Sequence, residues 1–107
     1  MAKIKSKIII LGKNGFIAKN LCNKLKKHKI NFVSFSKEKL NLEKKTSVKF
    51  LKKFIKPKDK IVFISAIAPV KNMEMLLRNI KILNNVTEAL NGKLFKQLIY
   101  ISSDAVF

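Results

Sequence analysis

The chain has 107 residues, the size of one domain, and 48% of them are apolar, which excludes a disordered polar tail. Its single cysteine, Cys22, excludes an internal disulfide and a cysteine-based metal cluster, so we expect no metal site and a reducing, cytoplasmic location. The longest nearly apolar stretch, residues 61–70, is too short to cross a bilayer.

Lys and Arg number 24 against 6 Asp and Glu, which gives a net charge of +18. All of these basic residues except Arg78 are lysine, and they are spread along the chain. Sequence-specific nucleic-acid readers rely on Arg, whose planar guanidinium contacts phosphate and guanine through paired hydrogen bonds. We therefore expect solvated lysine faces that reflect codon bias, with only non-specific, salt-sensitive contact with nucleic acid.

The first part of the chain predicts a strand, a helix and a second strand. Residues 7–11 are a β-branched apolar run that ends at Gly12, a pattern typical of a strand buried on both faces. Apolar residues at three- and four-residue steps over 17–25 then predict a helix with a basic last turn. Residues 31–35 predict the second strand, and residues 36–45 a polar loop.

The second part continues the same alternation. Thr46 or Ser47 is expected to cap a helix that ends before Pro57, and residues 61–64 predict a third strand. A long helix is predicted from about residue 72 to 90, with a left-handed cap at Gly92, and residues 98–101 predict a fourth strand. The apolar stripe of the long helix includes Met73, Leu76, Leu77, Ile80, Leu83, Val86 and Leu90.

Alternating strands and helices with short connections predict an α/β fold with a parallel sheet. We expect a Rossmann-like, doubly wound sheet that is incomplete, with about four strands and three helices. Residues 1–107 form one domain in this interpretation, because the sequence has no linker, internal repeat or low-complexity block.

A glycine turn, Gly12-x-x-Gly15-x-x-Ala18, joins the first strand to the first helix. Gly12 permits a positive φ, and Gly15 lets a phosphate approach the backbone at the positive end of the helix. Ala18 is small enough for the helix to lie close to the sheet. The placement between a strand and a helix favours dinucleotide binding over a plain turn.

The end of the second strand bears on the choice between NAD and NADP. An acidic residue there would hold the ribose 2′-hydroxyl of NAD, but Ser36 and Lys37 follow the strand and Glu38 comes later. Serine and lysine can instead receive a 2′-phosphate. The cofactor is therefore NAD or NADP, with a lean toward NADP.

Four separated segments resemble, in the same order, the N-terminal part of an extended short-chain dehydrogenase/reductase of the NAD-dependent epimerase/dehydratase family. The glycine turn is similar to the family's Gly-x-x-Gly-x-x-Gly, and residues 62–66 to the strand and turn that pass under the cofactor. Asn79 with residues 85–89 resembles a family helix that contains Asn-Leu-Leu-Glu-Ala, and residues 100–107 resemble its Ser-Ser-x-x-Val-Tyr segment.

The resemblance implies roles for the residues that match the family's motifs. Ser103 aligns with the catalytic hydroxyl, which hydrogen-bonds the reacting oxygen of the substrate, and Ser102 faces the cofactor. Asp104-Ala105 departs from the Asp-Glu pair of sugar-nucleotide dehydratases, so epimerase or reductase chemistry fits better. The residues expected to contact the dinucleotide are Gly12, Asn14, Gly15, Phe16, Ile17, Ser36, Lys37, Asn41, Leu42, Ser65, Ala66, Asn79 and Ser102.

The family's catalytic Tyr and Lys, four residues apart, have no counterpart in this sequence. Tyr100 is the only Tyr, the residue four positions later is Asp104, and we expect Tyr100 to be a packed or edge aromatic of the fourth strand. The chain is thus interpreted as a fragment that lacks the Tyr-x-x-x-Lys helix and the substrate lobe and is inactive alone. In a full-length protein we expect a sugar-nucleotide-like substrate and a homodimer formed partly by the long helix, whose apolar faces are then partly uncovered here.

Two alternatives from other classes stay open at this point. A non-catalytic NAD(P)-binding regulator would use the same glycine turn without a substrate. A basic nucleic-acid-binding protein would use the positive charge, with a steep dependence on salt and no response to dinucleotides.

Overall fold

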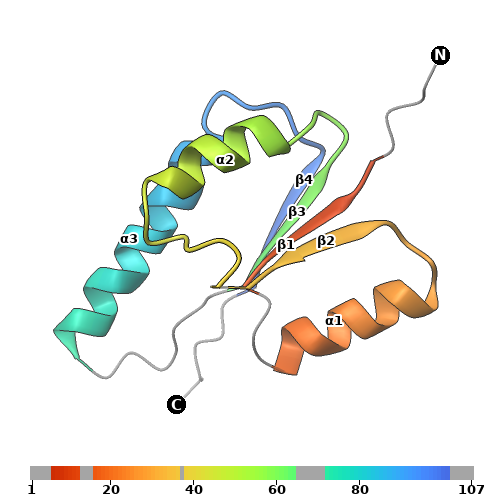
Figure 1. The fold of residues 1–107 in the computed structure, drawn as a ribbon, viewed down its shortest axis with the longest axis horizontal. Helices are drawn as coiled ribbons and strands as arrows, with labels where there is room; N and C mark the ends of the chain where they lie inside the picture. Colours follow the sequence, from red (N-terminus) through yellow and green to blue (C-terminus); the bar gives the residue numbers. More distant parts are fainter. Residues whose placement is uncertain (1–5, 13–15, 37, 65–71, 102–107) are drawn as a thin grey trace.

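The structure is a computed structural model that describes residues 6–12, 16–36, 38–64 and 72–101. Four parallel strands pair in the order β2-β1-β3-β4 and alternate with three helices along the chain (Figure 1). The predicted Rossmann-like α/β arrangement is confirmed. The elements are β1 (Ile8–Leu11), α1 (Phe16–Lys27), β2 (Phe32–Phe35), α2 (Thr46–Phe54), β3 (Lys60–Ile64), α3 (Met73–Leu90) and β4 (Gln97–Ile101).

The sheet separates two apolar cores, with α1 on one face and α2 and α3 on the other (Figure 1). Successive side chains of a strand point to opposite faces, so Ile9 of β1 enters the α2/α3 core and Ile10 enters the α1 core. The same alternation holds in β3, where Ile61 and Val62 lie opposite Ile9 and Ile10. Burial on both faces explains why β1 and β3 are nearly continuous apolar runs.

The two outer strands are less covered than the two central ones. The side chains of β2 are all partly buried, and four of the five residues of β4 are exposed. β4 pairs with β3 alone among the described strands, so its other edge is not paired with any of them.

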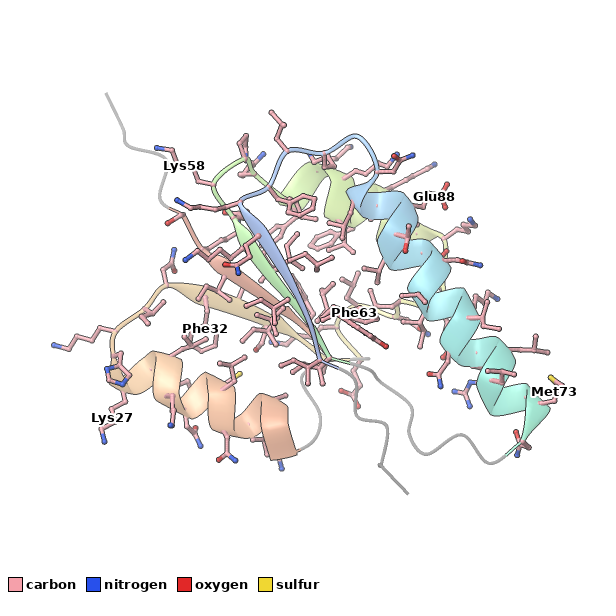
Figure 2. All side chains as sticks on the ribbon, turned by 180° about the vertical axis from the view of Figure 1, so that it is seen from behind. Lys27, Phe32, Lys58, Phe63, Met73 and Glu88 are labelled. Carbon is pink, nitrogen blue, oxygen red and sulfur yellow. The ribbon has the colours of Figure 1, made fainter. Side chains whose placement is uncertain are left out.

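The buried face of α3 differs from the predicted apolar stripe. Its core-facing residues are Ile82, Asn85, Val86 and Ala89, all in the second half of the helix. The first half extends past the sheet, and Met73 projects from its free end (Figure 2). Five members of the predicted stripe are therefore exposed, namely Met73, Leu76, Leu77, Ile80 and Leu83. None of the described helices, α3 included, is long and apolar enough to span a membrane.

The two predicted helix caps have opposite outcomes. Gly92 after α3 has φ +75, so the predicted left-handed cap is confirmed. The predicted side-chain cap of α2 is wrong, because the N-cap residue is Lys45 and makes no such hydrogen bond. The preceding turn replaces it: the Ser47 and Val48 amides donate to the Lys44 and Lys45 carbonyls at 3.1 and 3.0 Å.

A buried ion pair closes the amino-terminal edge of the sheet. The Asp59 side chain is fully buried, and its Oδ2 accepts a hydrogen bond from Lys7 Nζ at 2.7 Å. Asp59 also accepts the backbone N–H groups of Lys7 and Lys56, at 3.2 and 2.9 Å. One carboxylate thus joins the entry of β1 to the turn between α2 and β3.

We predict that Asp59→Ala lowers the free energy of unfolding by about 2–4 kcal/mol, because it leaves a largely buried ammonium and two amides without their acceptor. Urea denaturation followed by circular dichroism measures this. The control is Glu38→Ala, which removes an exposed carboxylate and should change the free energy by less than about 0.5 kcal/mol. Equal effects of the two substitutions would contradict the assigned role of Asp59.

Candidate functional site

The order in which the chain adds strands to this parallel sheet reverses between β1 and β3. From β1 the chain steps to β2 on one side, and then returns to place β3 on the other side of β1 (Figure 1). In open α/β sheets, connections that leave a reversal point in opposite directions open a crevice at the carboxyl ends of the strands, and ligands bind there. The candidate site is therefore the carboxyl edge of β1, β2 and β3.

Gly12 lies at the centre of this edge, directly after β1. Its N–H donates to the Phe35 carbonyl at the end of β2, at 3.2 Å. Its φ is +96, and a Cβ built on it would lie 2.6 Å from the Ile64 carbonyl oxygen at the end of β3. Only glycine fits this position, because a side chain would both strain the backbone and strike β3.

Helix α1 follows the glycine turn and begins at Phe16. Its first turn contains no acidic residue, so nothing there competes with an anion for the amide groups. Ala18 is 1% exposed and packs in the α1 core with Ile10 and Val62. The prediction that Ala18 lets the helix lie close to the sheet is confirmed.

Ser36 occupies the carboxyl end of β2, one position after Phe35, which lies opposite Leu11 in the register. It is buried, and its carbonyl accepts the N–H groups of Lys39 and Leu40 at 3.1 and 2.9 Å. Ser36 and Gly12 thus follow two paired strand ends. Among the described residues, the acidic residue nearest to Ser36 in the sequence is Glu38, and its side chain is exposed in the turn that follows.

Asn41 and Leu42 belong to a loop that is fastened to α3. The Asn41 side-chain oxygen accepts the Glu43 N–H at 3.0 Å, and the Leu42 side chain is buried in the α2/α3 core. The Leu42 carbonyl accepts a hydrogen bond of 2.7 Å from the Asn85 side chain. Glu43 pairs with Arg78 at 3.1 Å, and this hydrogen bond and the charge attraction raise the pKa of Arg78.

Sequence reasoning missed this attachment of the loop to α3. The available signal was Asn85, a polar residue at a helix position flanked by Ile82, Val86 and Ala89, which are all buried. Asn79, a predicted dinucleotide contact, is the half-buried neighbour of Arg78 on α3. The loop and α3 therefore hold Asn41, Leu42 and Asn79 in one region of the fold.

Several predicted site residues lie outside the described part of the chain. β3 ends at Ile64 and β4 at Ile101, and these two residues are opposite each other in the sheet. The predicted contacts Ser65 and Ser102 come next in the sequence after these two strand ends. The predicted residues that the structure does not describe are Asn14, Gly15, Lys37, Ser65, Ala66, Ser102 and Ser103, together with the side chains of Phe16 and Ile17.

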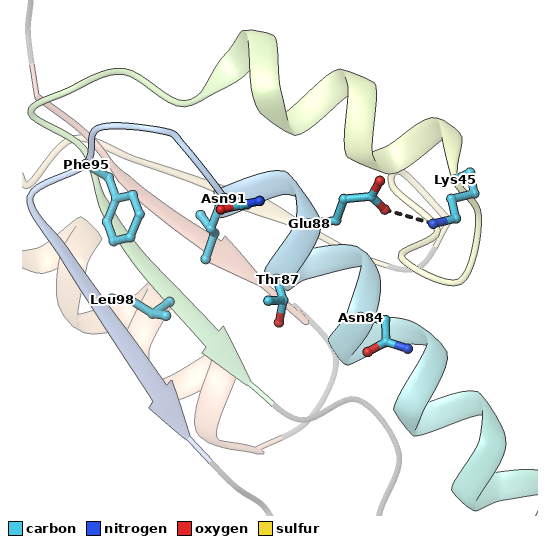
Figure 3. Close-up of a pocket in the computed structure, with 8 residues that line it drawn as sticks. Lys45, Asn84, Thr87, Glu88, Asn91, Phe95 and Leu98 are labelled. Atoms are coloured by element: carbon cyan, nitrogen blue, oxygen red, sulfur yellow. Dashed lines mark hydrogen bonds and ion pairs between the residues drawn. The ribbon is translucent and has the colours of Figure 1, made fainter.

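A second hollow, a groove of about 660 Å³, lies between α3 and β4 (Figure 3). Phe95, Leu98 and Leu90 supply apolar lining, and Lys45 bonds Glu88 across one end at 2.8 Å. The hydrogen bond and the attraction of Lys45 lower the pKa of Glu88. Both side chains of this ion pair are exposed, and none of the described residues that line the groove is a buried charged group suited to catalysis.

We predict that Gly12→Ala destabilises the fold more than Gly92→Ala. Both glycines have positive φ, but a Cβ at Gly92 meets nothing within 4 Å. Gly92→Ala should cost about 1 kcal/mol, for the backbone strain alone. Gly12→Ala should cost about 2–4 kcal/mol, because a backbone carbonyl must also move. Urea denaturation measures both, and equal costs would contradict the close approach of β1 to β3.

The model of the family described as RmlD substrate binding domain matches residues 6–107. No curated protein and no solved structure gives a significant match. The family model supports a relationship to NAD(P)-dependent, short-chain dehydrogenase-like proteins of the sugar-nucleotide reductase type, and not specifically to the epimerase/dehydratase branch named from the sequence. Because the match covers nearly the whole chain, this protein belongs to the RmlD substrate-binding domain family.

Proposed function

We propose that this domain binds NADPH at the carboxyl edge of β1, β2 and β3, where the strand order reverses. In this proposal it is the cofactor-binding part of a reductase that acts on a nucleotide-linked keto sugar. The observation that carries the proposal is the close approach of Gly12 to β3, directly before the start of α1. Glycine positions let a diphosphate approach the backbone closely, and the positive end of the following helix favours its negative charge. The family match supports the choice of a sugar-nucleotide reductase.

In this proposal the backbone from Gly12 to Ile17 holds the diphosphate, and Asn14 and Gly15 belong to the same turn. Ser36 and Lys37 receive the adenosine end, where a lysine favours the 2′-phosphate of NADPH. Asn41 and Leu42 lie in the loop that flanks the adenine, and Asn79 faces this region from α3. When bound, the cofactor supplies the hydride that reduces a carbonyl group.

The nicotinamide end belongs to the carboxyl ends of β3 and β4 in this proposal. Ser65, Ala66 and Ser102 line the cofactor, and the Ser103 hydroxyl donates a hydrogen bond to the carbonyl oxygen being reduced. That bond would stabilise the negative charge that develops on the oxygen during hydride addition.

The proton for the reduced oxygen needs a separate donor. Tyr100 is ill suited, because it lies within β4 with its ring packed against Phe63 at a centroid distance of 5.3 Å. The 107 residues contain no Tyr-x-x-x-Lys pair, so in this proposal they contribute binding and Ser103 but not the proton transfer. In this proposal the exposed apolar residues of α3 pack against a second copy of the chain.

We predict that NADPH binding, measured by isothermal titration calorimetry, is at least about tenfold weaker in Gly15→Val, because a branched side chain blocks the approach of the diphosphate to the backbone. Asn23→Val is the control, because it places the same side chain on an exposed position of α1. Unchanged affinity in Gly15→Val, or no binding by the folded wild-type chain, would refute the proposed function.

We predict that Lys37→Glu weakens NADPH binding by about tenfold and changes NADH binding little, because the new carboxylate repels the 2′-phosphate that only NADPH carries. The matched control is Lys39→Glu, which makes the same charge change on an exposed residue two positions away. Fluorescence titration of both reduced dinucleotides measures the ratio of affinities. Equal losses in the two variants would show that net charge alone sets the preference.

A further inference from the structure

A stripe of lysines runs along the solvent side of α2. Lys52 and Lys53 lie three and four residues after Lys49 on α2, and Lys56 follows two positions after the helix ends. All four are exposed, and we call them the α2 ridge. α2 contains no acidic residue, and the only one between residues 44 and 60 is Asp59, which is buried against Lys7. Glu88, which senses the charge of Lys52, already pairs with Lys45. The ridge is therefore a local concentration of positive charge.

An aromatic ring borders this ridge. Phe50 is 41% exposed, and its ring stacks on Phe54 with 5.3 Å between the centroids and 16° between the planes. Phe35 of β2 packs edge-on against both rings, at 5.5 and 5.4 Å. The ammonium of Lys7 lies 4.6 Å from the Phe54 ring centre on the way to Asp59. Phe50 is thus a supported aromatic surface and not a loosely hanging side chain.

Lysines beside a fixed, exposed aromatic ring suit single-stranded nucleic acid. The lysines neutralise successive phosphates, and an unstacked base lies on the ring, whichever base it is. Base pairs in a duplex are already stacked and give Phe50 nothing to bind. We propose that the α2 ridge together with Phe50 binds single-stranded nucleic acid without sequence preference.

An anionic membrane surface is the competing partner for a basic helix. Membrane-surface helices bury a free apolar face among the lipid chains. The apolar face of α2 is already used, because Val48, Leu51 and Ile55 are at most 7% exposed and lie in the α2/α3 core. A single phenylalanine remains for insertion, so the observations favour nucleic acid.

Helix α1 offers a matched comparison on the other face of the sheet (Figure 1). Lys24, Lys26 and Lys27 are exposed there, and none of the α1 side chains that the structure describes is Phe, Tyr or Trp. Lys52, Lys53 and Lys56 lie at or just beyond the end of α2, beside the amino-terminal edge of the sheet and apart from the proposed dinucleotide site (Figure 1). Phe50 lies nearer to that site, because its ring packs on Phe35, one position before Ser36. The lysine variants therefore test the ridge independently of NADPH binding.

The experiment is a fluorescence anisotropy titration of a labelled oligo-dT of about 16 nucleotides at several salt concentrations. The variants are Phe50→Leu, which keeps apolar packing but removes the aromatic face, and the pair Lys52→Glu with Lys53→Glu. The control pair, Lys26→Glu with Lys27→Glu on α1, makes the same change in net charge. Circular dichroism melts establish that every variant keeps the fold.

We expect Phe50→Leu to weaken oligo-dT binding by about tenfold with little change in its salt dependence. The α2 pair should make the negative slope of log affinity against log salt shallower by about 1.4, the value for two lost phosphate contacts, and the α1 pair should change it far less. Equal effects of the two lysine pairs, or no effect of Phe50→Leu, would overturn the proposal in favour of general charge attraction. Tighter binding to phosphatidylglycerol vesicles than to oligo-dT, dependent on Phe50, would overturn it in favour of a membrane surface.

Discussion

The close packing of the end of β1 against the end of β3 is the constraint on which the site depends. A Cβ at Gly12 would lie 2.6 Å from the Ile64 carbonyl oxygen, so this crossing is possible only for a residue without a side chain. The same glycine accepts its positive φ and bonds the end of β2 through its amide. One residue therefore brings three strand ends together shortly before α1 begins, and the start of a helix is a position that favours an anion.

Contacts elsewhere in the fold support the carboxyl edge of β1, β2 and β3. Asp59 and Lys7 hold the opposite, amino-terminal edge, while Asn85 and Arg78 of α3 fasten the loop that follows β2. Central strands that are buried on both faces give the edge a rigid base. The outer parts, β4 and the first half of α3, remain exposed and apolar, so the domain carries surface that a larger assembly could cover.

The sequence alone predicts the elements and their order, because buried parallel strands and amphipathic helices have distinct apolar periods. The glycine turn and the left-handed cap at Gly92 are also readable, since each needs a backbone conformation that few residues adopt. Contacts between distant residues are not: Lys7 meets Asp59 across 52 positions, and Arg78 meets Glu43 across 35. The sequence predicts that the apolar faces of α3 are partly uncovered, but not that the uncovered part is the first half of the helix, because periodicity does not say where the sheet beneath a helix stops.

The central claim is that a dinucleotide diphosphate lies against the backbone where β1 passes into α1. Backbone amide chemical shifts, followed by NMR as NADPH is added to the chain, test it most directly. The account predicts that the largest shifts occur from Gly12 to Ala18 and around Ser36, with little change along the α2 ridge. No shifts at saturating NADPH, or shifts confined to the groove between α3 and β4, would contradict it.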